Sequence, residues 1–164
     1  MLEVTPHTVI AVGESEYCMV LLKDRNRSRY LPVWMRVQRA QPIVLWLQGI
    51  RPVRPRIHDL FVKVAEQLGV KLVRAMIYGV EDGTLLSRVI LHKDDEEIAL
   101  ECRASDAIAV AVTRSVPITV AEEIMRLAGF GPQRYEASTT EPEDEEDKLA
   151  VFRDFIEGLD LGDL

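Results

Sequence analysis

Residues 71–102, KLVRAMIYGVEDGTLLSRVILHKDDEEIALEC, contain three apolar stretches separated by two short polar turns. The first stretch, KLVRAMIY, is followed by GVEDG, and the second, TLLSRVILH, is followed by KDDE. Short runs of apolar and β-branched residues bounded by Gly and Asp are typical of strands joined by tight turns. We therefore predict a three-stranded antiparallel meander at residues 71–102, central in a mixed sheet.

Strand and helix patterns also alternate on both sides of this meander. Strands are expected at residues 9–12, 17–23, 29–34 and 116–120. Helices are expected at about residues 36–47, 57–68, 104–113 and 121–130, with Ser105 as the N-cap of the third. This order of elements predicts an α+β fold, in which residues 1–137 form a single domain with a mixed, largely antiparallel sheet packed by helices.

The C-terminal end of the chain differs in composition from this predicted domain. Residues 138–148, STTEPEDEEDK, are acidic and contain no apolar side chain, so we expect a disordered linker. Residues 149–164 are expected to form a short amphipathic helix, with apolar side chains at Leu149, Phe152, Phe155, Ile156 and Leu159. We expect this helix to dock on an apolar surface of its own or a neighbouring subunit, and we predict a homodimer. The alternative is a mobile tail that only aids solubility.

Charge is distributed unevenly along the chain. Residues 139–164 carry ten acids and two bases, a net charge of −8, and the whole chain carries −7, so the remaining residues sum to +1. Within these, residues 23–63 hold ten Lys or Arg and two Asp, a net charge of +8. A basic segment built mostly from arginine attracts phosphate-bearing polyanions. Alternatively, these arginines lie on several faces and pair with the acidic tail.

The sequence carries no signal for a membrane or an oxidising compartment. Its longest apolar runs, such as AIAVAV at residues 107–112, are far too short to span a bilayer, and MLEVTPHTVI at the N-terminus does not resemble a signal peptide. Cys18 and Cys102 form no metal-binding spacing and lie in apolar, strand-like surroundings. We expect them to be buried thiols, and the protein to be cytoplasmic.

The segment RPVRPRIHDL, residues 51–60, places three arginines before a His-Asp pair at the expected start of a helix. Asp59 is its only acid, so Arg51, Arg54 and Arg56 cannot all be neutralised locally. The segment is either a solvated loop before a capped helix or one wall of an anion site, because helix N-termini present free N–H groups.

Several blocks of sequence occur together in one order. They are YLPVWM at residues 30–35, AQPIVLWLQG at 40–49, RPRIHDLF at 54–61, DGTLLSRVIL at 82–91 and ECRASDAIAVAVTRSVPITVAEEI at 101–124. These blocks resemble the bifunctional nuclease family, bacterial and plant domains that are named for hydrolysing both DNA and RNA. The resemblance covers roughly residues 17–124, and FRDFIEGL at 152–159 is similar to a short helix that many bacterial members carry. It implies a nuclease of low sequence specificity.

The chain departs from the family's usual sequence at two places. A glycine and an acid of other members correspond to Arg36 and Arg39 here. If the missing acid is a metal ligand in other members, this chain binds metal poorly. The residues that match the family's motifs are His58, Asp59, Arg103, Ser105 and Asp106.

Phosphodiester hydrolysis requires an activated water, neutralisation of the phosphate charge and a proton for the leaving oxygen. The expected catalytic residues are His58, Asp59 and Asp106, with His58 as the proton shuttle. A divalent ion, Mg²⁺ or Mn²⁺, would supply the first two requirements, and its expected ligands are Asp59, Glu101 and Asp106. The residues expected to bind substrate are Arg54, Arg56, Arg103 and Ser105.

We predict that His58, Asp59, Arg103 and Asp106 lie together in space, since they belong to two junctions between a loop and a helix. The expected partner is nucleic acid, DNA or RNA, bound through its phosphates with little sequence preference. Aromatic residues make up only 6% of the chain and do not alternate with the basic ones, so base stacking is limited.

Each candidate residue also has a plainer structural interpretation. Asp59 and Asp106 stand at helix starts, where an acid is favourable by about 0.3–1 kcal/mol. Ser105 is a natural N-cap, His58 a natural packing residue, and Arg103 a natural ion-pair partner for Asp106. Arg36 and Arg39 favour a second function, a non-catalytic nucleic-acid-binding or regulatory module with the fold of the nuclease family.

Overall fold

A computed structural model describes residues 1–13 and 15–131 of the chain. These residues form a seven-stranded mixed sheet with helices packed against it, so the predicted α+β class is confirmed. The expected domain end at residue 137, the acidic linker at 138–148 and the C-terminal helix at 149–164 lie outside the described residues. Among the described helices, none has the length and apolar character needed to cross a bilayer.

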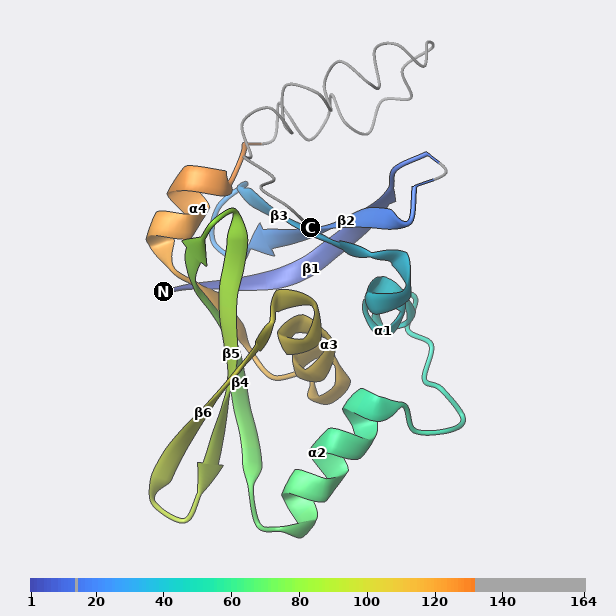
Figure 1. Cartoon of the computed structure of the whole chain (residues 1–164), viewed down its shortest axis with the longest axis vertical. Helices are drawn as coiled ribbons and strands as arrows, with labels where there is room; N and C mark the ends of the chain where they lie inside the picture. Colours follow the sequence, from blue (N-terminus) through green and yellow to red (C-terminus); the bar gives the residue numbers. More distant parts are fainter. Residues whose placement is uncertain (14, 132–164) are drawn as a thin grey trace.

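Two antiparallel meanders make up most of the sheet (Figure 1). The first consists of β1 (Leu2–Ala11), β2 (Tyr17–Asp24) and β3 (Tyr30–Arg36), and the second of β4 (Lys71–Glu81), β5 (Thr84–Lys93) and β6 (Glu96–Arg103). The second is the meander predicted at residues 71–102. The strand order, β3-β2-β1-β7-β4-β5-β6, places it at one end of the sheet, so its expected central position is wrong.

A strand of three residues, β7 (Ile118–Val120), occupies the centre of the sheet instead. It pairs antiparallel with Leu2–Val4 of β1 and parallel with Ala75–Ile77 of β4. These short pairings are the only ladder between the two meanders in the part of the chain that the structure describes. The second meander is therefore displaced from the centre because the chain returns to insert β7 between the two halves.

Helix α3 (Ala104–Arg114) forms the middle of the core. Eight of its residues are buried, four of them alanines, so the backbone of α3 can approach its neighbours closely. It contacts α1 (Val37–Leu47), α2 (Ile57–Gln67) and strands of both meanders. Figure 1 shows α3 beside the sheet, with α1 and α2 next to it. The fourth helix, α4 (Glu122–Ala128), follows β7 and contacts β3 and β4.

Most element boundaries lie within a few residues of their predicted positions. The first strand, Leu2–Ala11, is longer than the predicted 9–12. Its first half was not predicted because buried and exposed residues alternate there and no apolar run marks it. Helix α3 begins at Ala104, so its N-cap is Arg103; the predicted N-cap, Ser105, is instead buried in the first turn. The predicted third helix is therefore correct, but its cap is not.

Enlarging a buried alanine of α3 should destabilise the domain. Ala111 is 0% exposed, and we expect Ala111→Leu to lower the free energy of unfolding by about 1–3 kcal/mol, since a filled core accepts added methylenes only with strain. The control is Ala99→Leu on the exposed surface of β6, where the change should stay within about 0.5 kcal/mol. Urea unfolding followed by circular dichroism measures both; equal midpoints would contradict the packing described for α3.

Candidate functional site

Two side chains from distant parts of the sequence meet beside the core. His58 lies in the first turn of α2 and Asp106 in the first turn of α3. The distance from His58 Nε2 to Asp106 Oδ1 is 3.7 Å. The prediction that these two residues lie together is therefore confirmed. Their junctions meet because α2 packs against α3, and the buried residues of α2 are Val62 and Ala65.

The two nitrogen atoms of His58 have different surroundings. The side chain is 18% exposed, and its Nδ1 atom is buried without a hydrogen-bond partner in the described part of the chain. Its Nε2 atom is the one that faces Asp106, whose side chain is 39% exposed. A separation of 3.7 Å is too long for a direct hydrogen bond, but one water molecule can contact both atoms at this distance. The pair is thus suited to holding a water molecule at the surface.

Both helices point their N-termini toward this part of the surface, and an arginine precedes each. Arg56 is the N-cap of α2, where Asp59 completes a capping box, and Arg103 is the N-cap of α3, which has no side-chain cap hydrogen bond. Helix N-termini carry free N–H groups and positive potential, both of which favour anions. The arrangement therefore combines an acid–base pair with a favourable environment for phosphate.

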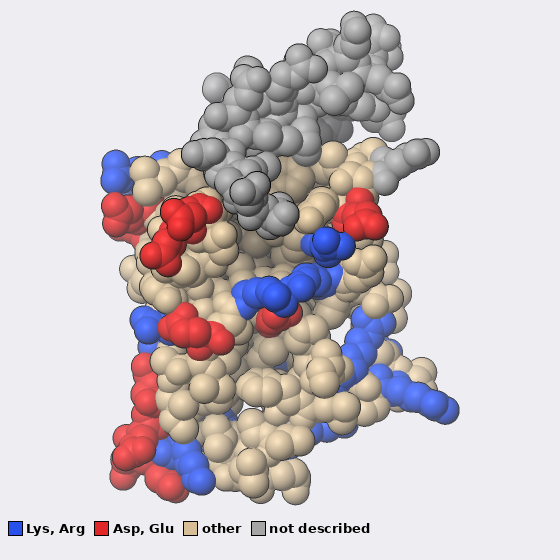
Figure 2. Space-filling model, viewed as in Figure 1, with Lys and Arg blue, Asp and Glu red and all other residues tan. Residues whose placement is uncertain are grey.

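The arginines of this region have no acidic partner among the residues that the structure describes. Arg51, Arg54, Arg56 and Arg103 make no ion pair with any residue that the structure describes. Other arginines of the basic segment at residues 23–63 pair with acids, as Arg29 does with Asp24 at 2.7 Å. Figure 2 shows basic side chains across the middle of this face and along the connection between α1 and α2; acidic side chains lie beside the central basic ones and near the β5–β6 turn.

The three acids predicted to hold a metal do not converge. Asp59 accepts a hydrogen bond from the backbone N–H of Arg56 through Oδ2, at 2.9 Å, and so closes the first turn of α2. Glu101 lies on the opposite face of the sheet from the core, because its neighbour Cys102 packs toward the core and strand residues alternate. No group of three or more His, Cys, Asp or Glu side chains is placed to bind a metal in residues 1–13 and 15–131. The predicted Mg²⁺ or Mn²⁺ site does not fit these side chains.

Glu101 belongs instead to a polar cluster that the sequence analysis missed. Its Oε2 accepts a hydrogen bond from the hydroxyl of Tyr78 at 2.7 Å, and Arg88 lies 3.9 Å from its other oxygen. The Arg88 guanidinium also lies over the Tyr78 ring, 4.4 Å from its centre. The cross-strand register of β4, β5 and β6 brings these residues together. The sequence analysis could have found the cluster by predicting which residues of these strands pair.

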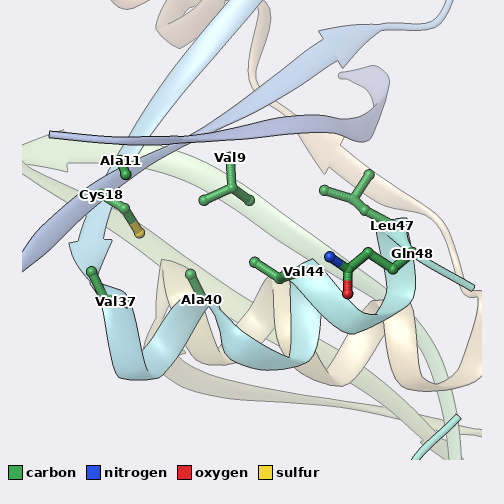
Figure 3. A pocket seen from close by; sticks show the side chains of 8 residues that line it. All are labelled: Val9, Ala11, Cys18, Val37, Ala40, Val44, Leu47 and Gln48. Atoms are coloured by element: carbon green, nitrogen blue, oxygen red, sulfur yellow. The ribbon is translucent and has the colours of Figure 1, made fainter. Parts of the chain in front are cut away.

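A pocket elsewhere in the domain has a different character. It lies between β1, β2 and α1, has a volume of about 360 Å³, and is lined by Val9, Ala11, Cys18, Val37, Ala40, Val44, Leu47 and Gln48 (Figure 3). Gln48 is the one polar side chain of this lining besides the thiol of Cys18. A surface of this kind does not suit a phosphate, so the pocket is no alternative to the site at His58 and Asp106.

Comparison with known proteins agrees with this architecture. A bifunctional nuclease domain model matches residues 20–133. The chain belongs to the bifunctional nuclease family. Two relatives from Mycobacterium tuberculosis, the uncharacterized proteins MT1877 (strain CDC 1551 / Oshkosh) and Rv1829 (strain ATCC 25618 / H37Rv), are each 35% identical over 141 residues, which is 84% of both sequences. Membership supports a function related to nucleic acid.

Arg36 and Arg39, which the sequence analysis singled out, differ in their surroundings. Arg36 ends β3, where its guanidinium pairs with Glu16 at 3.0 Å and lies over the ring of Tyr17. Arg39 is half-buried in the first part of α1, a helix that packs against α3. Arg36 is thus neutralised locally, whereas Arg39 makes no ion pair with another described residue.

The thiol of Cys102 in this bifunctional nuclease domain reports on the charge of Asp106. Burial and, after it, the negative charge of Asp106 raise the pKa of Cys102 to about 11. Cys102 is therefore a protonated thiol at neutral pH and a poor nucleophile.

Replacing Asp106 should make this thiol more acidic. In Asp106→Asn the pKa of Cys102 should fall below about 11, because a nearby negative charge no longer opposes the thiolate, and alkylation by iodoacetamide at pH 8–9 should accelerate by up to about tenfold. Peptide mass spectrometry separates this reaction from that of Cys18. The exposed Asp95→Asn serves as control; if it changed the Cys102 rate equally, Asp106 would not be the neighbouring charge.

Proposed function

We propose that this chain is a nuclease of low sequence specificity that hydrolyses phosphodiester bonds in DNA and RNA. The observation that carries the proposal is the 3.7 Å approach of His58 Nε2 to Asp106 Oδ1, between two helix N-termini that are each preceded by an arginine. Membership of the bifunctional nuclease family supports the same reaction class.

His58 and Asp106 would activate the attacking water. With the buried Nδ1 protonated, Nε2 and Asp106 Oδ1 are both acceptors, and one water can donate a hydrogen bond to each. The oxygen of this water then points its lone pairs toward the solvent side, where a phosphodiester can bind. As the oxygen attacks phosphorus, Nε2 takes the proton, and Asp106 stabilises the resulting imidazolium. The same proton then passes to the leaving oxygen, so that the reaction consumes one water.

Arginines would bind and neutralise the phosphate. Arg103 and Arg56 stand directly before the two helices, and Arg54 lies in the adjoining loop. A guanidinium suits phosphate oxygens geometrically and stabilises the charge that develops on them. Contacts of this kind read the backbone of a nucleic acid and not its bases, which explains low sequence specificity. We assign no step to a divalent ion, because the predicted ligands Asp59 and Glu101 are held elsewhere.

The second candidate function is a non-catalytic module that binds nucleic acid. The arrangement of the acids favours it: Asp59 closes a helix turn and Glu101 faces away. The resemblance to the family also implies an acid at the position that Arg39 occupies. Such a module would use the same arginines for phosphate contacts, and the His58–Asp106 pair would only join α2 to α3.

Substitution of the pair separates the two functions. We expect His58→Ala and Asp106→Asn each to lower the hydrolysis rate of a labelled oligonucleotide by about 10²–10⁴-fold, with binding little changed, since general acid–base catalysis contributes an effect of this size. His92→Ala is the matched control, because His92 is exposed at the end of β5, outside the pair. Assays with Mg²⁺, Mn²⁺ and EDTA test the metal separately. Absence of hydrolysis in every condition, with binding intact, would support the binding module instead.

A further inference from the structure

Helix α2 presents a stripe of large apolar side chains to the solvent. The buried residues of α2, Val62 and Ala65, lie on a different side of the helix. Five further apolar side chains share an arc of about 100° around the helix axis. They are Ile57, Leu60, Phe61, Val64 and Leu68, and their exposed fractions run from 37% for Phe61 to 72% for Ile57. We call these five residues the α2 stripe, and the described residues leave it exposed.

The size of the α2 stripe is that of an interaction surface. Single exposed apolar residues are normal, but a contiguous patch of about 300–600 Å² on a monomer is often functional. A standard interface buries about 800 Å² on each partner, of which about 65% is apolar in homodimers, so each partner contributes roughly 500 Å² of apolar surface. The five side chains of the α2 stripe can supply much of this area. The connection before α2 also exposes Ile50 and Val53.

The N-terminal end of the α2 stripe is basic. The loop at residues 51–56 contains Arg51, Arg54 and Arg56 and no acid, so its net charge is +3. None of the three arginines forms an ion pair with a residue that the structure describes. The N-terminus of a helix carries the positive end of its dipole, which adds to this potential.

The C-terminal end of the α2 stripe lies next to an acidic turn. Gly69, with a φ of +75°, reverses the chain there, and Lys71 at the start of β4 pairs with His92 of β5. The β5–β6 turn begins two residues after His92. Its four acids and the three nearby bases give a net charge of −1; the acids are Asp94, Asp95, Glu96 and Glu97, and the bases are Lys71, Arg74 and Lys93. In Figure 2 the visible side of α2 is largely uncharged and lies between the basic connection and this turn.

A patch with an apolar centre and ends of different charge is complementary to a second copy of itself. In a dimer with two-fold symmetry, two copies of one helix face each other either parallel or antiparallel. Parallel contact would bring together two loops of charge +3, which repel each other. Antiparallel contact places each loop beside the partner's acidic turn and beside the negative end of the partner's α2 dipole. An anionic lipid surface fits less well, because it would attract the loop but repel the four acids of the turn.

We propose that two copies of this chain form a two-fold symmetric dimer in which their α2 stripes pack antiparallel. Ile57 of one copy then lies near Leu68 of the partner subunit, and the loop at 51–56 lies beside the partner's β5–β6 turn. Helix α2 also carries His58, so the interface runs beside each candidate site. The dimer itself does not depend on the proposed function.

The mass of the full-length protein in light scattering, measured over a concentration series, tests the dimer. We expect the unsubstituted chain to be a dimer. Val64→Asp with Leu68→Asp should raise the dissociation constant of the dimer by about 30-fold or more, since apolar contacts at the centre of an interface dominate its affinity. Both positions are exposed, so the fold should be kept, which circular dichroism checks. Val80→Asp with Leu127→Asp, at exposed sites on β4 and α4, is the matched control and should leave the dimer intact.

Exchange of charges tests the antiparallel orientation. At low salt, Arg54→Glu should weaken the dimer by about two- to fivefold, because it reduces the attraction between the loop and the acidic turn. Asp95→Arg should weaken it further, because the turn then becomes basic. Adding Arg54→Glu to Asp95→Arg should instead strengthen the dimer, since the substituted loop faces a basic turn. The same substitution therefore has opposite effects in the two backgrounds. In a parallel dimer Arg54→Glu would strengthen the contact in both.

Three results would overturn the proposal. The first is a monomeric mass for the unsubstituted chain at every concentration; binding of that monomer to vesicles of anionic phospholipid would assign the α2 stripe to a membrane. The second is a dimer that Val64→Asp with Leu68→Asp leaves unchanged. The third is an effect of Arg54→Glu that has the same sign with and without Asp95→Arg, which would exclude the antiparallel contact.

Discussion

The pairing of Ile118–Val120 with both halves of the sheet is the constraint on which the rest of this structure depends. The two meanders are each stabilised by their own hairpins, and in the described chain β7 is the one strand that pairs with both. Because β7 follows α3 directly, its insertion also holds α3 against both halves. Three residues of strand thereby fix the position of the helix that carries Asp106.

The candidate site follows from how helices stack on that arrangement. Helix α3 begins where β6 ends, so Arg103 and Asp106 are placed by the edge strand as well as by the buried alanines. Helix α2 packs against α3, and His58 approaches Asp106 to 3.7 Å. The site is therefore a product of packing between elements that are distant in sequence, and its precision depends on the core beneath it.

Two of the acids predicted to be catalytic or metal-binding residues instead make structural contacts. The carboxylate of Asp59 is held by the backbone N–H of Arg56, and that of Glu101 by Tyr78 and Arg88. An acid near a helix start or opposite an arginine on a sheet has a structural explanation that sequence cannot separate from a catalytic one. His58 and Asp106 differ because they face each other across two elements, and one imidazole nitrogen is buried with no hydrogen-bond partner among the described residues.

The sequence by itself determined the α+β class, both candidate junctions and most helices and strands, because hairpin turns and helical periodicity are local signals. It also identified His58 and Asp106, through the resemblance of their motifs to a family. Only the tertiary structure decided the place of the second meander, since strand order depends on where β7 inserts. Only the tertiary structure showed that Glu101 and Asp106 lie apart. Side chains alternate between the two faces of β6, but which face is turned toward the core is decided when α3 packs on the sheet. The tertiary structure also showed that the apolar face of α2 points outward, since periodicity reveals a stripe but not what covers it.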